Sequence, residues 1–129
     1  MSVFKKDLSV PKVNCIYEDG KLRYKNVVGK YEKWYYKNKI HRDNDLPAVI
    51  RSNGDQEWYQ NGKLHRDNDL PAIINVNNSV IWYERWYQHG KLHNTTGPAR
   101  IKENGKTEYY INDKPLSEYE FMFVTGETV

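Results

Sequence analysis

The sequence predicts an all-β protein, an elongated single-layer antiparallel meander of stacked β-hairpins that ends in a short helical turn. A repeat is the first reason: the pairs Trp34-Tyr35, Trp58-Tyr59 and Trp82-Tyr83 follow one another at intervals of 24 residues. Turn signals of the Asn-Gly type within each interval are the second, and the third is that no stretch between residues 16 and 112 has a long helical periodicity. Periods of about 20–50 residues are typical of proteins in which one supersecondary unit stacks on the next.

The repeat extends well beyond the Trp-Tyr pair. The string His-Arg-Asp-Asn-Asp-Leu-Pro-Ala occupies residues 41–48 and recurs unchanged at residues 65–72, and a version one residue shorter occupies residues 93–99. Weaker copies at residues 16–23 and 109–114 resemble the atypical end units that cap a stack. We therefore expect one domain over residues 1–129, with an N-terminal arm (1–15), repeats (about 16–114) and a C-terminal cap (115–129).

Turn signals divide each unit into short strands. Asn-Gly pairs stand at residues 53–54, 61–62 and 104–105, and weaker forms stand at 19–20, 77–78 and 89–90. Asn-Gly favours the two positive-φ positions of a type I′ turn, whose twist matches antiparallel strands. Gly62 and Gly90 are accordingly predicted to be structural turn residues.

The third unit contains four extra residues, which we place after Trp82-Tyr83, at residues 84–87. An even insertion does not exchange the faces of a strand. Trp82 and Trp86 are then expected on one face and Tyr83 and Tyr87 on the other, within a strand from about 79 to 88 that is the longest of the sheet. Beyond the repeats, Ser117 and Glu120 have the spacing of a capping box, which predicts a short helix there.

Composition narrows the class of function. The 129 residues carry 20 basic and 17 acidic side chains, and this net charge of +3 is too weak to favour nucleic acid or an anionic membrane. An aromatic content of 14% argues against disorder. The single cysteine, Cys15, excludes an internal disulfide. No apolar leader is visible at the N-terminus, so we expect an intracellular protein rather than a secreted one.

The His-Arg-Asp-Asn-Asp loops allow two interpretations. Asp43, Asp45, Asp67 and Asp69 can serve as structural turn residues that bond nearby backbone amides, or they can bind a cation. The turn is favoured, because the loop lacks the glycine and the distal glutamate of a calcium loop. We expect no metal, no cofactor and no catalytic residue, since the repeat gives no set of nucleophile, base and orienting group.

Residues 34–74, with weaker matches from 16 to 114, resemble the MORN-repeat variant proteins of giant DNA viruses, which carry tandem units with the same His-Arg-Asp-Asn-Asp-Leu-Pro-Ala string. The resemblance implies β-hairpins stacked in an elongated sheet and no catalytic residues. It also implies a viral product, present in the host cytoplasm, in the virion, or in both.

The aromatic columns are the main candidate site. In register, Trp34, Trp58 and either Trp82 or Trp86 form one row, and Tyr35, Tyr59 and either Tyr83 or Tyr87 form another. These rings either make the core or remain uncovered, because a single-layer sheet has no second layer to pack on. Uncovered rings predict a non-enzymatic scaffold that associates with itself, as a symmetric homodimer.

Three alternatives remain open. The aromatic residues could line a groove for a partner peptide, anchored by Trp58, Trp82 and Trp86. The protein could bind membrane phospholipid, although its basic residues are interspersed with acidic ones. It could also bind single-stranded nucleic acid on its aromatic rings, which the charge balance disfavours.

Overall fold

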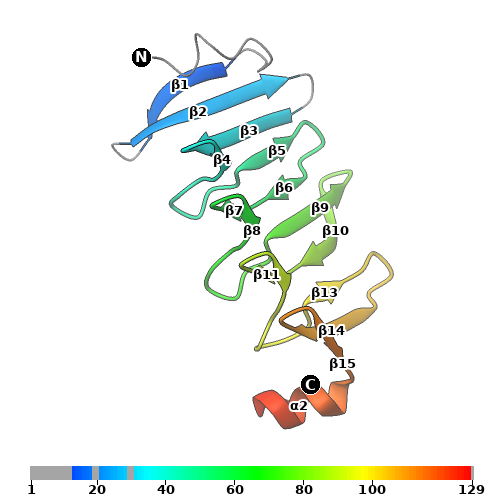
Figure 1. Ribbon diagram of the computed structural model, residues 1–129. Coiled ribbons are helices and arrows are strands. Elements are labelled where there is room, and N and C mark those ends of the chain that lie inside the picture. The colour runs from blue at the N-terminus through cyan, green and yellow to red at the C-terminus, as the bar shows by residue number, and fades with distance from the viewer. Residues whose placement is uncertain (1–12, 19–20, 29–30, 129) are drawn as a thin grey trace.

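The computed structural model describes residues 13–18, 21–28 and 31–128 of the chain. Its main feature is one antiparallel sheet in which successive strands lie side by side along an elongated molecule (Figure 1). The predicted all-β meander is confirmed, and the sheet does not close into a barrel. The strands along this path are β1 (Val13–Glu18), β2 (Lys21–Val28), β3 (Tyr31–Tyr36), β5 (Val49–Arg51), β6 (Gln56–Glu57), β9 (Ile73–Asn77), β10 (Val80–Arg85), β13 (Arg100–Ile101), β14 (Thr107–Ile111) and β15 (Lys114–Leu116).

The N-terminal arm that we expected over residues 1–15 falls outside the described residues as far as residue 12. Residues 13–15 belong to β1, which pairs with β2.

Small hairpins form a row along one side of the sheet (Figure 1). They are made by the end of β3 with β4 (Lys39–Ile40), by β7 (Tyr59–Gln60) with β8 (Lys63–Leu64), and by β11 (Tyr87–Gln88) with β12 (Lys91–Leu92). Both central turn residues have positive φ, at 51° and 81° for Asn61 and Gly62 and at 49° and 83° for His89 and Gly90. These values are those of type I′ turns. In the first unit Lys37 and Asn38 take the same conformation without a glycine.

Backbone bonds identify which residues are equivalent in successive repeats. The N–H of Trp34 donates to the carbonyl of Ala48, that of Trp58 to Ala72 and that of Trp86 to Ala99, each at 2.8 Å. The three alanines have no exposed surface. The core is therefore a stripe along the length of the molecule, to which each repeat adds one large ring and one small residue. A side chain larger than alanine would not fit at these positions without displacing a neighbour.

Our placement of the insertion was wrong. Trp86, not Trp82, is the third member of the tryptophan row, and the extra residues lie in the β9–β10 hairpin that precedes it. A bulge between Ile81 and Tyr83 leaves Trp82 without a partner across the hairpin and breaks the alternation of faces. The strand expected over residues 79–88 is also interrupted at Trp86, and β2, with 8 residues, is longer than β10, with 6.

The C-terminal cap is the helix α2 (Glu118–Thr125). The predicted capping box is confirmed, because the Glu120 N–H donates to Ser117 Oγ at 3.1 Å and the Ser117 N–H donates to Glu120 Oε1 at 2.8 Å. Gly126 ends the helix in the left-handed conformation, with φ of 77°. On its inner side, the ring of the buried Phe121 packs 4.7 Å from that of Tyr109, so the helix covers the last ring of the core stripe.

Candidate functional site

The repeated loop contains a tight turn at its middle. In the first copy Asn44 and Asp45 have φ of 63° and 57°, and in the second copy Asn68 and Asp69 have φ of 64° and 58°. Two successive residues with positive φ make a turn of the I′ kind, and asparagine and aspartate tolerate this conformation better than other residues with a side chain. The turn directs the side chains of the loop toward the neighbouring repeat.

Histidine joins each loop to the turn of the following hairpin. The backbone N–H of Asn61 donates to His41 Nδ1 at 2.9 Å, and Nε2 of the same ring lies 2.8 Å from Asp43 Oδ1. Because Nδ1 accepts, the neutral ring carries its proton on Nε2 and donates it to the carboxylate. His65 repeats this arrangement, with the N–H of His89 at 3.0 Å and Asp67 at 2.8 Å. Both nitrogens of each ring are therefore used for structure.

Arginine covers the tryptophan of its own repeat. The guanidinium carbon of Arg42 stands 3.7 Å from the Trp34 ring centroid, and that of Arg66 stands 3.7 Å from the Trp58 centroid. Such stacking is typical of a cation–π contact. The indoles of Trp34 and Trp58 are consequently only 4% and 6% exposed. This burial removes both rings from the surface that a partner could reach.

Each arginine also holds the preceding turn. Arg66 Nε and Nη2 donate to the two carboxylate oxygens of Asp45 at 2.8 and 3.2 Å, and its Nη1 donates to the carbonyl of Pro71 at 3.1 Å. Arg42 does the same to Glu18 and to the carbonyl of Pro47. Trp58 Nε1 completes the contact by donating to the carbonyl of Asp45 at 3.0 Å. The carboxylate of Asp45 thus has a definite role, as the acceptor for the arginine of the next repeat.

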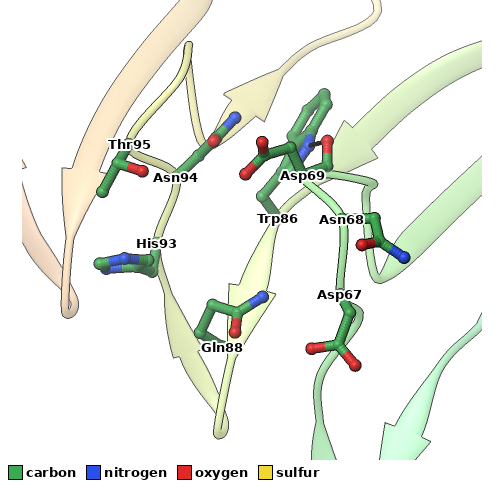
Figure 2. Close-up of a pocket in the computed structure, with 8 residues that line it drawn as sticks. All are labelled: Asp67, Asn68, Asp69, Trp86, Gln88, His93, Asn94 and Thr95. Atoms are coloured by element: carbon green, nitrogen blue, oxygen red, sulfur yellow. Dashed lines mark hydrogen bonds between the residues drawn. The ribbon is translucent and has the colours of Figure 1, made fainter.

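The third repeat lacks this arginine. Asn94 stands at the position of Arg42 and Arg66, and its Nδ2 takes over only the bond to the proline carbonyl, with Pro98 O at 2.9 Å. Trp86 still donates from Nε1 to the carbonyl of Asp69 at 2.9 Å. A pocket lies between the two loops, and Figure 2 shows the residues that line it, namely Asp67, Asn68, Asp69, Trp86, Gln88, His93, Asn94 and Thr95. The equivalent loops of the preceding repeat also enclose a pocket, whose lining includes Asp45, Trp58 and Arg66.

The other aromatic candidates lie in mixed environments. Tyr35, Tyr59, Tyr83 and Tyr87 are all partly buried, as is Trp86. Trp82 is 41% exposed, with its ring edge-on to Tyr83 at 6.4 Å. Of the sequence-predicted rings, the structure therefore brings Trp34, Trp58 and Trp86 into one row, and it leaves Trp82 outside that row, near the tip of the β9–β10 hairpin.

Exposed apolar side chains gather in two places. Val80 and Ile81 adjoin Trp82 near the hairpin tip and are 65% and 53% exposed. On α2, Tyr119 and Phe123 are one helical turn apart, and both are largely exposed. Of these residues only Trp82 was recognised as a candidate from the sequence, although the run Val80-Ile81-Trp82 is a visible signal, because three successive apolar residues on an exposed strand are unusual.

Three titratable groups have shifted pKa values that bear on the loops and the sheet. Burial raises the pKa of Asp43, but the hydrogen bond from His41 and the guanidinium of Arg23 outweigh it and hold that pKa below its ordinary 3.8. Burial, together with the neighbouring Glu57 carboxylate, raises the pKa of Tyr59 to about 12. Burial also raises the pKa of Glu84.

Within the described part of the chain, no group of three or more His, Cys, Asp or Glu side chains is arranged to hold a metal ion. Across the same residues, no helix has the length and apolar character needed to cross a membrane.

Comparison with known proteins gives no relative. No family model matches the chain, no curated protein matches it, and no solved structure matches it.

Proposed function

We propose that the protein is a non-enzymatic interaction scaffold that associates with itself, as a homodimer, through its repeat sheet. The observation that supports this function is the apolar tip of the β9–β10 hairpin. Val80, Ile81 and Trp82 are successive, and each has 41% or more of its surface exposed. A cluster of large apolar side chains in water is unfavourable, and burying it against another chain is the usual solution.

A second copy is the partner that best fits this tip. The three residues are successive at the end of one hairpin, and a two-fold axis can bring this segment of two chains together, so that the same residues of both chains form the contact. The unpaired Trp82 at the bulge provides the large ring that often anchors an interface.

The absence of catalysis is part of the same proposal. His41 and His65 use both ring nitrogens in bonds that hold neighbouring repeats together, so neither is free to act as a general base. Membrane binding has less support, because Arg51, Arg100 and Lys102 pair with carboxylates of the same sheet.

Sedimentation equilibrium across a hundredfold range of concentration tests this function. The native chain is expected to reach the mass of two chains, and Ile81→Glu is expected to remain at the mass of one. Phe123→Ser is the matched control, because it removes an exposed aromatic side chain at the other end of the molecule, and it should still dimerise. A native chain that keeps the mass of one chain at every concentration contradicts the proposal.

We further propose, from the resemblance of residues 34–74 to the MORN-repeat variant proteins of giant DNA viruses, that the chain is a viral product of this type and acts inside the infected cell or within the virion. Detection by mass spectrometry of its peptides in purified particles tests this part separately from dimerisation.

A further inference from the structure

The second repeat contains a complete binding arrangement for a guanidinium group. Arg66 lies flat on one face of Trp58, at 3.7 Å from the ring centroid, and bonds both oxygens of the Asp45 carboxylate. Stacking on an indole together with two parallel bonds to one carboxylate is the geometry that suits a planar guanidinium and not a lysine ammonium. The first repeat uses the same arrangement for Arg42, on Trp34 and Glu18.

The third repeat keeps the receiving groups and has lost the arginine. Trp86 corresponds to Trp58 and Asp69 to Asp45, whereas the shorter Asn94 replaces Arg66. Over residues 31–128 no cation stands above the Trp86 ring or pairs with the Asp69 carboxylate. In Figure 2 that carboxylate extends into the space beside Asn94 and Trp86. The pocket there has a volume of about 230 Å³, which is small for a cofactor and suits the end of one side chain. The equivalent pocket of the preceding repeat, of about 360 Å³, has Arg66 in its lining, so the missing arginine and not the pocket itself distinguishes the third repeat.

We propose that this pocket, formed by Asp69, Trp86 and Asn94, binds an arginine side chain of another protein. The guest guanidinium lies on the open face of the Trp86 indole and donates two N–H bonds to the Asp69 carboxylate, as Arg66 does one repeat earlier. Asn94 keeps its own bond to the Pro98 carbonyl and forms the floor of the site. The nearby Asp67, whose side chain is 77% exposed, adds negative charge that favours a cation at the entrance.

The bound arginine must come from a different protein, because every arginine of this chain already contacts an aromatic ring. Each of its arginines already stands over an aromatic ring of its own chain, at 3.7 to 5.2 Å from the ring centroid. They are Arg23, Arg42, Arg51, Arg66, Arg85 and Arg100. A second copy could therefore fill the pocket only by giving up one of these contacts.

A titration with blocked amino acids tests the specificity of the pocket. The probes are N-acetyl-arginine methylamide, the corresponding lysine derivative, and the citrulline derivative, which has nearly the same shape without the charge. The indole N–H signals of the four tryptophans are followed by nitrogen-15 NMR and assigned with Trp→Phe variants. The arginine probe is expected to shift the Trp86 signal in a saturable way, at least fivefold more tightly than the lysine probe, and citrulline should leave it unchanged.

Variants locate the site. Asp69→Asn is expected to weaken the arginine probe at least tenfold, whereas Glu103→Gln, which removes the same charge at an exposed position elsewhere, should not change its affinity. Replacing residues 94–98 by the sequence of residues 66–71 introduces an arginine at the position of Asn94. This internal arginine should occupy the pocket and abolish binding of the arginine probe. If that graft does not fold, Asp69→Asn alone still decides the question. Arg66→Ala supplies a gain of function, because it should open a second site that is detected on the Trp58 signal.

Three results would overturn the proposal: equal shifts with citrulline or lysine, unchanged affinity in Asp69→Asn, or a shift confined to Trp82. A Trp86 signal that moves when the protein is diluted without any probe would identify a second copy as the occupant and overturn the assignment to another protein. The outcome is separate from dimerisation at the hairpin tip, because Ile81→Glu should abolish dimerisation and leave the arginine titration unchanged.

Discussion

Replacing Asp43 by Asn is expected to lower the free energy of unfolding by about 3 kcal/mol, the lower end of the cost of removing one partner of a buried ion pair. Arg23 has no exposed surface, and its Nη2 contacts the Asp43 carboxylate. The substitution leaves this guanidinium buried beside a neutral amide. We choose the lower end because the Asp43 side chain is itself 23% exposed, so that water can partly replace the lost charge.

Asp67→Asn is the matched control, since it occupies the same position in the next copy of an identical string. Its side chain is 77% exposed, and its bond from His65 can be kept by the amide oxygen, so the expected loss is within about 0.5 kcal/mol. Urea unfolding at neutral pH, followed by circular dichroism, measures both values. Two variants of equal stability would refute the assignment of Arg23 as a buried cation that depends on Asp43.

The same pair has a definite pH dependence. The pKa of Asp43 is lowered in the folded protein, so its stabilising contribution is complete above the ordinary value of 3.8 and is lost as the pH falls through the lower folded value. The difference in stability between the native chain and Asp43→Asn should therefore shrink as urea unfolding is repeated in increasingly acid buffer below that value. A difference that stays constant through this range contradicts the sign.

Three further changes have expected outcomes. His65→Ala should cost about 2 kcal/mol, because a backbone N–H and a carboxylate lose their partner, whereas His93→Ala, which breaks only the bond from Asn112, should cost about half as much in urea unfolding. Asn38→Gly should raise stability by about 0.5 kcal/mol, measured as a higher thermal midpoint, because its φ of 65° suits glycine better. Tyr59 should ionise only near its pKa of about 12 in an ultraviolet titration, and the stability that depends on its neutral form should be lost as the pH rises above 10; Tyr59→Phe should remove this late step.

Local signals predicted the elements well. Asn61-Gly62 gave a hairpin turn and Ser117 with Glu120 gave a helix start, because in each case the residues that stabilise the conformation are within three positions of one another. The meander followed from the period of 24 residues, since a unit that repeats must meet its neighbour in the same way each time.

The sequence left the third member of the tryptophan row open between Trp82 and Trp86, and the four extra residues were misplaced because the spacing was counted from Trp82-Tyr83. Trp82 lies 24 residues after Trp58 by coincidence, whereas Trp86-Tyr87-Gln88 is identical to Trp58-Tyr59-Gln60, and each string is followed by a turn whose second residue is glycine. Counting back from the turn at Gly90 would have identified the true equivalent. The bulge at Trp82 itself has no strong local signal, because no glycine or proline marks it.

The role of arginine in the repeated loop could not be obtained from the period. Repetition predicts that neighbouring units touch, but it does not say which atoms meet. Arg66 lies 8 positions after Trp58 and 21 positions after Asp45 in the sequence, and its contact with both depends on the relative orientation of successive repeats. Only after that contact is known can it be seen that Asn94 leaves Trp86 and Asp69 without an arginine.

The row of small hairpins has a consequence for the length of the molecule. The N–H of Gly62 donates to the carbonyl of Ile40 in the unit before it, and that of Gly90 donates to Leu64, each at 2.8 Å, so these bonds join each hairpin to the adjacent one. A gene duplication that copied one repeat would therefore lengthen the sheet by one repeat without changing the contacts within the others. Each added repeat would increase the distance between the two ends of the molecule by the same amount.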